Sequence, residues 1–268
     1  MKLGISSYSL TWSVGVPGYE RPVKPVDVFD LLNIAAKNDI KLVQIADNIA
    51  LDQMDSKDLY KLRDLSVDLG VEIEVGTKGT GPELMLKYLE IAKILDSKIV
   101  RTLITMAEIG EAEDDIAKVL PKFAEEGIAI AIENHGLHTT RQLAALFQKF
   151  DSPYIGCCLD TVNSFGALEC PEQVINDLVP YINNLHIKDF DIKRVKHMMG
   201  YEILGTPAGI GRLNIPEVIG KIKGLGKSPS AILELWTPYT NSVEETIKLE
   251  NKWFKQSLEF LKKQKEFY

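Results

Sequence analysis

The sequence predicts a single domain of the α/β class, a closed (β/α)₈ barrel that spans residues 1–268. Short apolar runs of strand length alternate with longer segments of helical period along the whole chain. No glycine-, serine- or proline-rich stretch divides the chain, and 45% of its residues are hydrophobic, which is enough for one large core. Strands are expected at residues 3–10, 42–47, 72–77, 98–103, 128–134, 155–161, 182–189 and 231–236.

Amphipathic segments follow the strands, and their apolar residues recur every three or four positions. Gly70 and Gly127 fall where a helix would end in a left-handed residue. The clearest helices are expected at residues 26–39, 56–70, 82–96 and 243–267.

Two helix starts carry the spacing of a capping box. Thr80 precedes Glu83 by three residues, and Ser242 stands in the same relation to Glu245. Pro82 suits the first turn of the helix after Thr80.

A doubly wound open sheet is the alternative to the barrel, because periodicity alone does not show closure. The first strand-to-helix turn lacks the Gly-x-Gly-x-x-Gly pattern of dinucleotide-binding sheets, which favours the barrel.

Charge and hydropathy exclude some partners. The net charge of −7 argues against nucleic acid, because binders of nucleic acid present a clustered basic face. No apolar run approaches the roughly 20 residues that cross a bilayer. We therefore expect no membrane partner and a cytoplasmic protein, in which Cys157, Cys158 and Cys170 are small core residues.

Polar residues collect at the ends of the expected strands. In a parallel barrel these ends meet at one mouth, where active sites lie. Glu133, Asp160 and Glu234 end otherwise apolar runs, and His186 stands within "NNLHIKDF". Converging carboxylates repel one another, and a divalent cation relieves that repulsion. Three oxygen ligands and one imidazole favour Mn²⁺, with Mg²⁺, Co²⁺ and Zn²⁺ as alternatives.

The segments "AIENHG", "CLDTVNS", "LHIKDF" and "LELW", with the glycine-rich "GTPAGIGRLNIPEVI", resemble the xylose isomerase-like TIM barrel superfamily over essentially the whole chain. The resemblance implies Glu133, Asp160, His186 and Glu234 as metal ligands. It also implies that Glu133 and Glu234 are the catalytic residues, which exchange protons with the substrate on opposite faces, and that the protein is a homodimer or homotetramer.

The sequence departs from the ketose epimerases of this superfamily at three places. Asn163 stands where they carry a histidine, Lys188 follows His186 without the expected arginine, and Thr139 replaces a substrate-contacting glutamate. Endonuclease IV, another member, needs more histidines than the four present here.

A metal chelated by a carbonyl and an adjacent hydroxyl stabilises an enediolate. We therefore expect a metal-dependent isomerase or epimerase that acts on a keto-sugar or sugar acid, possibly phosphorylated. The alternative is a lyase, either a dehydratase or a decarboxylase of a 3-oxo sugar acid such as 3-oxo-isoapionate, since "SSYSLTW" and "VQIADN" resemble a branch that acts on oxidised sugars. An inactive sugar-binding barrel is the third hypothesis.

The remaining residues of the mouth indicate the substrate. Cations there suggest an anionic ligand, and aromatic side chains can pack against a sugar ring. His135 is placed to bond the substrate or move a proton, and the long segment around Trp12 is expected to wall the pocket. The predicted substrate-binding residues are Trp12, Lys78, Arg101, His135, Asn163, Lys188, Arg212 and Trp236.

Overall fold

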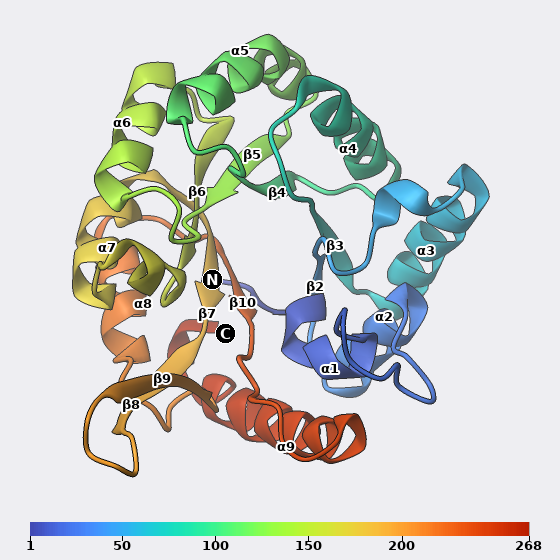
Figure 1. The fold of residues 1–268 in the computed structure, drawn as a ribbon. Coiled ribbons are helices and arrows are strands. Elements are labelled where there is room, and N and C mark those ends of the chain that lie inside the picture. Colours follow the sequence, from blue (N-terminus) through green and yellow to red (C-terminus); the bar gives the residue numbers. More distant parts are fainter. Residues whose placement is uncertain (268) are drawn as a thin grey trace.

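Eight parallel strands close into a barrel in a computed structural model that describes residues 1–267 (Figure 1). Consecutive strands pair with one another, and the last barrel strand pairs with the first to complete the closure. The predicted barrel is therefore confirmed, and the open sheet is excluded. The barrel strands are β1 (Leu3–Ser6), β2 (Leu42–Ile45), β3 (Glu72–Gly76), β4 (Ile99–Leu103), β5 (Ala129–Glu133), β6 (Ile155–Asp160), β7 (Ile182–Ile187) and β10 (Ser230–Leu233).

Helices surround the barrel and bury their apolar faces against it (Figure 1). In α2 the buried positions follow the spacing of one helical face: Val28, Leu31, Leu32 and Ala35. The outer helices are α2 (Val28–Lys37), α3 (Ser56–Leu69), α4 (Pro82–Ile94), α5 (Ile109–Glu125), α6 (Thr140–Phe150), α7 (Pro171–Leu178), α8 (Ile215–Gly224) and α9 (Val243–Leu261). A short helix α1 (Thr11–Val14) follows the first strand. No helix among residues 1–267 is long and apolar enough to cross a membrane.

Several helix ends follow the predicted chemistry. Gly70 and Gly127 have φ values of 61° and 65°, in the left-handed region where glycine is favoured. The Ser242 side chain accepts a hydrogen bond from the backbone N–H of Glu245 and so caps α9, but only this half of the predicted capping box forms, because the Glu245 carboxylate accepts from the Asn241 side chain. That helix ends at Leu261, before the predicted end at residue 267.

The predicted capping box of Thr80 and Glu83 is wrong. Helix α4 begins after Gly81, with Pro82 in its first turn and no side-chain cap. The Thr80 hydroxyl donates instead to the sulfur of Met106, at 3.4 Å. The N-cap of the helix is Gly81, one residue later than the capping box requires, and the spacing of Thr80 and Glu83 alone does not show this.

The first strand is shorter than predicted, because β1 ends at Ser6 and a 3-10 turn covers Ser7–Leu10. The Ser6 hydroxyl accepts from the backbone N–H of Tyr8, and the backbone N–H of Ser6 donates to the Ser9 hydroxyl. Serine side chains here satisfy backbone groups that a strand would have paired, which ends the strand.

An antiparallel hairpin, β8 (Asp189–Arg194) and β9 (Tyr201–Thr206), leaves the barrel after β7 (Figure 1). The strand predicted at 182–189 therefore divides at Lys188, and the hairpin itself was not predicted. A side chain at Gly205 would overlap the backbone oxygen of Trp236. The hairpin thus packs directly on the segment that follows β10.

The cysteines are only partly as predicted. Cys157 and Cys158 are buried in β6, whereas Cys170 is exposed at the start of α7. The prediction of a core position is wrong for Cys170, because the strand to which the other two belong ends ten residues before it.

Candidate metal and substrate site

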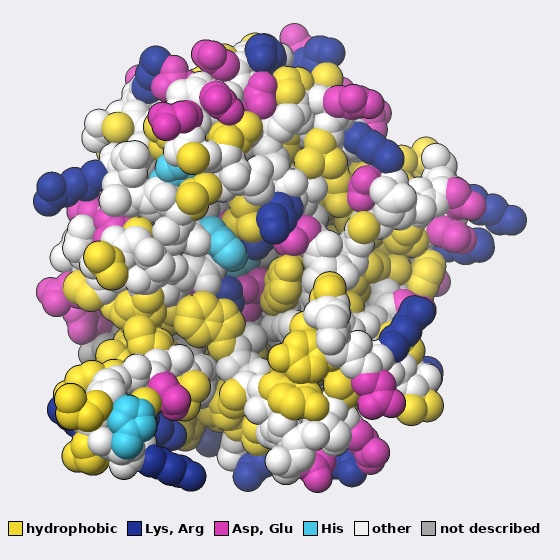
Figure 2. All heavy atoms as spheres, in the orientation of Figure 1, with side chains coloured by type: hydrophobic (Ala, Val, Ile, Leu, Met, Phe, Trp, Pro, Cys, Tyr) yellow, Lys and Arg dark blue, Asp and Glu magenta, His cyan; other side chains and the backbone are white. Residues whose placement is uncertain are grey.

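A pocket of about 420 Å³ opens at the carboxyl ends of the barrel strands. Figure 2 shows a hollow near the centre of this face, where basic, acidic and histidine side chains gather beside hydrophobic ones. The predicted site residues that line it are Trp12, Lys78, Arg101, Glu133, His135, Asn163, Lys188, Glu234 and Trp236.

The four predicted metal ligands converge at the base of this pocket, where Glu133 and Glu234 line it. Glu133 ends β5, Asp160 ends β6, and Glu234 directly follows β10, so the parallel strands bring them beside His186 in β7. Nδ1 of His186 lies 3.4 Å from Oε2 of Glu133, 3.4 Å from Oε1 of Glu234 and 3.9 Å from Oδ2 of Asp160. Ligand atoms of Asp160, His186 and Glu234 all lie within 4.8 Å of one another.

Two buried atoms of this cluster, Nδ1 of His186 and Oε1 of Glu234, have no hydrogen-bond partner among the described residues, and Oδ2 of Asp160 meets only the ammonium of Lys188. Leaving a buried polar atom unpaired costs about 1–3 kcal/mol. Two oxygens and one nitrogen that face the same small volume are suitable ligands for a divalent cation. The donor set therefore fits a metal ion.

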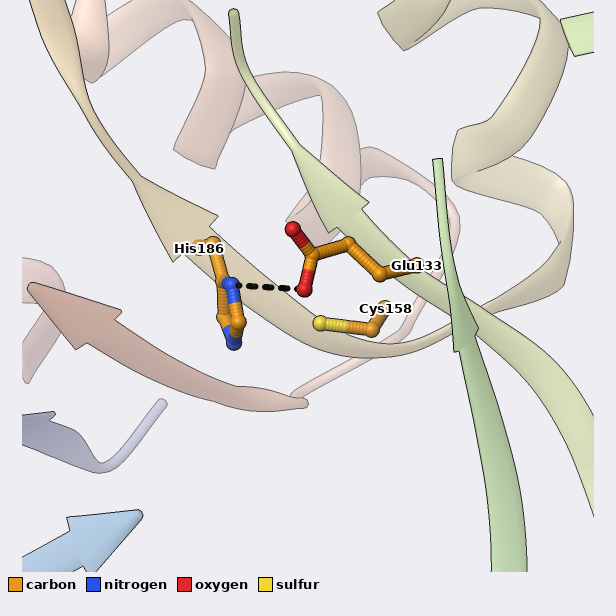
Figure 3. A group of neighbouring side chains, drawn as sticks. All are labelled: Glu133, Cys158 and His186. Carbon is orange, nitrogen blue, oxygen red and sulfur yellow. Dashed lines mark ion pairs between the residues drawn. The ribbon is translucent and has the colours of Figure 1, made fainter. Parts of the chain in front are cut away.

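Cys158 lies beside Glu133 and His186, and the three side chains point toward one another (Figure 3). Burial, with the charge of Glu133 nearby, raises the pKa of the Cys158 thiol well above its usual value. Its Sγ lies 3.1 Å from Oδ1 of Asn184, to which it donates. Because a protonated thiol is a poor ligand, the oxygen and nitrogen set without Cys158 is the better metal site.

Glu133 is held by two neighbours, one at each oxygen. Nε of Arg101 donates to Oε2 at 2.6 Å, and Nδ2 of Asn163 donates to Oε1 at 2.6 Å. Arg101 also pairs with Asp47, at 2.8 Å. Burial disfavours the charged form of Glu133, but Arg101 and His186 outweigh it and lower the pKa of this carboxyl.

Lys188 bridges the other two carboxylates. Its Nζ lies 2.8 Å from Oδ2 of Asp160 and 2.7 Å from Oε2 of Glu234. Burial opposes the charged ammonium, but Asp160 and Glu234 outweigh it and raise the pKa of Lys188. Burial would also raise the pKa of Glu234, yet His186 and Lys188 lower it to about 2. Both groups therefore carry their charges at neutral pH.

Aromatic side chains form one wall of the pocket. Trp12 in α1 is 8% exposed, and its indole N–H donates to the backbone oxygen of Thr237 at 2.8 Å. Its ring stacks edge-on against Tyr19, with centroids 4.9 Å apart. Lys188 lies over the ring of Trp236, with Nζ 5.8 Å from its centroid.

Arg212 lies outside the pocket and does not accompany the other predicted substrate-binding residues. It is exposed on the hairpin side, where its Nε pairs with Asp191 at 2.8 Å. The glycine-rich segment that contains it wraps around Asp189, whose carboxylate accepts from the backbone N–H groups of Gly209, Gly211 and Leu213. Because the backbone of this loop is hydrogen-bonded to Asp189, the side chain of Arg212 faces solvent.

Sequence reasoning missed a buried polar group beneath the cluster, formed by Gln44, Glu74 and Asn184. Gln44 and Glu74 alternate with apolar neighbours in β2 and β3, which is the pattern of inward-facing barrel positions. That alternation was the available signal, but these residues lie before the strand ends, and it is at the strand ends that an active site is expected.

The chain also matches known proteins. The model of the xylose isomerase-like TIM barrel family matches residues 80–264. The 3-oxo-isoapionate decarboxylase of Pectobacterium atrosepticum is 32% identical over 265 residues, which cover 97% of this chain and 95% of the relative. Several solved structures share the fold, among them these two. D-psicose 3-epimerase with D-tagatose, from Clostridium cellulolyticum, has a TM-score of 0.73 and 15% identity, covering 98% and 97% of the two chains. The IOLI protein with a bound zinc atom has a TM-score of 0.66 and 17% identity, covering 97% and 99%.

Fold and site together define a (β/α)₈ barrel with a buried carboxylate and histidine cluster at its mouth. The chain belongs to the xylose isomerase-like TIM barrel family, as its residues indicated. Its relatives in this fold are enzymes that include a decarboxylase and an epimerase.

Proposed function

We propose that this protein is a divalent-metal-dependent lyase that removes the carboxyl group of a 3-oxo sugar acid as CO₂. The proposal rests on the hydrogen bonds that both carboxylate oxygens of Glu133 accept. Epimerisation needs two proton-transfer groups on opposite faces of the substrate, but both oxygens of Glu133 are engaged by Arg101 and Asn163. Decarboxylation needs only one proton, taken up after CO₂ leaves. The relative that is 32% identical over nearly the whole chain is a decarboxylase of such an acid, which supports the same choice.

The chain's residues suit the steps of this reaction. Loss of CO₂ from a 3-oxo acid breaks the bond between the carboxyl carbon and the next carbon, and the electron pair moves toward the oxo oxygen. Glu133, Asp160, His186 and Glu234 would hold a divalent ion, which we propose is Mn²⁺ and which would stabilise that negative charge. We propose Lys188, an ammonium that faces the pocket 2.7 Å from Glu234, as the donor of the proton that the carbon then requires, a step in which substrate binding must free Lys188 from its ion pairs.

Lys78 is the pocket cation available to an anionic substrate. Arg101 already pairs with Asp47 and Glu133, and Lys188 pairs with Asp160 and Glu234. For Lys78, which lines the same pocket, residues 1–267 provide no ion-pair partner. An ammonium group on the pocket wall suits a substrate carboxylate.

A sugar isomerase or epimerase is the second candidate. It is favoured by the placement of Glu133 and Glu234, each 3.4 Å from the same ring nitrogen of His186. If substrate binding released Glu133 from Asn163, these carboxylates would form the two-group arrangement that proton exchange requires.

Two assays of the Mn²⁺-loaded protein separate the candidates. The first follows CO₂ release from 3-oxo-isoapionate, and the second follows neutral keto-sugars in D₂O by NMR. We expect CO₂ release and no deuterium uptake by the sugars. Isomerisation or exchange of a neutral sugar without CO₂ release would replace the lyase by the second candidate. An Asp160→Ala, His186→Ala double variant, expected to bind no metal, is the control.

A further inference from the structure

A continuous chain of buried hydrogen bonds runs down the barrel interior from His186. Nε2 of His186 lies 2.6 Å from Oε1 of Gln44. The Gln44 amide nitrogen donates to Oε2 of Glu74 at 3.0 Å and to Oδ1 of Asn184 at 3.1 Å. Gln44, Asn184 and His186 are fully buried, and Glu74 is 7% exposed. Polar groups in such a place are costly unless each is paired, and every side-chain polar atom of Gln44, Glu74 and Asn184 is paired.

Glu74 fixes which end of the Gln44 amide faces the histidine. Two NH₂ groups, from Gln44 and Asn184, converge on Oε2 of Glu74, each at 3.0 Å. The other oxygen of Glu74 meets the hydroxyl of Ser230, which can donate or accept. Oε2 therefore accepts in either protonation state of Glu74. The Gln44 NH₂ must point to Glu74, and its oxygen must point to His186.

The orientation of Gln44 sets the tautomer of His186. An amide oxygen only accepts, so the ring proton must lie on Nε2. In the neutral ring, which is the form that binds a metal, Nδ1 then carries the lone pair, and this is the atom that faces Glu133 and Glu234 without a hydrogen-bond partner. Were the amide reversed, Nε2 would accept, the proton would move to Nδ1, and the nitrogen that faces the carboxylates would be blocked.

We infer that Gln44, oriented by Glu74, is a positioning residue that keeps Nδ1 of His186 free to bind a divalent metal. The inference rests on the metal site of the proposed function and adds residues that touch neither substrate nor metal. Groups that hold the far nitrogen of a metal-bound histidine commonly contribute 10–100-fold to metal affinity.

Metal affinity is the first test. Metal-depleted wild type, Gln44→Leu and Glu74→Gln are titrated with Mn²⁺ against a competing chelator, and their thermal unfolding is recorded. We expect Gln44→Leu to weaken binding by about 10–100-fold and Glu74→Gln by less, since a glutamine at position 74 releases only the orientation of Gln44. Ser97→Ala removes a buried hydroxyl that bonds the backbone at Ile99, and is the control for core damage, with unchanged affinity.

The tautomer is read separately by ¹⁵N NMR of histidine-labelled, metal-free protein. Wild type should show His186 protonated on Nε2, and Gln44→Leu should show a mixture. Binding by Gln44→Leu within about twofold of wild type would overturn the inference. So would an unchanged tautomer. If the wild type binds no divalent ion, the proposed function fails, and the NMR measurement alone decides the positioning role.

Discussion

Lys188 and Glu234 form a buried ion pair at the base of the pocket, with Nζ 2.7 Å from Oε2. The same ammonium lies 2.8 Å from Asp160, so one cation neutralises much of the repulsion within the cluster. In the absence of a metal, Lys188 and Arg101 are the charges that make this group of carboxylates compatible with burial.

Lys188→Met should therefore make the protein depend on metal for its stability. Removing one partner of a buried pair costs about 3–5 kcal/mol. Added Mn²⁺ should raise the unfolding temperature of the variant more than that of the wild type, because the ion replaces the lost charge. Thermal unfolding with and without Mn²⁺ measures this. Equal stabilisation of both proteins would contradict it, and Lys221→Met, at an exposed ion pair with Glu217, is the control.

Glu234→Gln should keep the fold and lose turnover. The substitution preserves shape but removes the charge of a proposed metal ligand and the carboxylate partner of Lys188, and we expect kcat to fall by at least about 100-fold. Steady-state CO₂ release measures the loss, and circular dichroism checks the fold. Glu217→Gln, on the exposed surface of α8, should leave kcat unchanged. Near-normal turnover of Glu234→Gln would remove its catalytic role.

Glu250 should add a pH dependence to stability. This carboxylate of α9 accepts from the backbone N–H groups of Trp12 and Ser13, and burial raises its pKa to about 7. The native state thus holds the proton more tightly than the unfolded chain, whose glutamates titrate near about 4.3. Its stabilising contribution is full below about pH 4.3 and is lost as pH rises through about 7.

Glu250→Gln isolates that contribution, because an amide does not titrate. Denaturant unfolding of both proteins between about pH 4 and 8 should show the wild type losing stability, relative to the variant, as pH rises. Parallel curves would show that Glu250 titrates normally in the folded protein.

Lys78→Met should weaken substrate binding without changing the chemical step. If Lys78 holds the substrate carboxylate equally in the ground and transition states, KM rises by about tenfold and kcat is preserved. Arg212→Met is a matched control, since Arg212 lies outside the pocket and pairs with Asp191. A larger effect of Arg212→Met than of Lys78→Met would invert this assignment.

The sequence predicted the barrel and its cluster for a physical reason. Glu133, Asp160 and Glu234 stand at the ends of apolar strands, and parallel closure brings such ends together. The same reasoning did not place Arg212, which was expected in the pocket and lies outside it, because a position in a glycine-rich loop does not show which way the loop folds. Gln44 and Glu74 were missed because their role depends on depth along the barrel axis, which follows from strand register and not from spacing.

The contact of Gly205 with Trp236 joins two parts of the chain that contribute differently to the pocket. The barrel strands carry the charged side chains of the cluster. The hairpin of β8 and β9 packs on the segment at Trp236, which forms part of the pocket wall. Mutations in β9, near Gly205, can therefore change the shape of the pocket without replacing any residue of the cluster. Changes in the hairpin can thus alter which ligands fit the pocket, whereas the residues of the charged cluster remain the same.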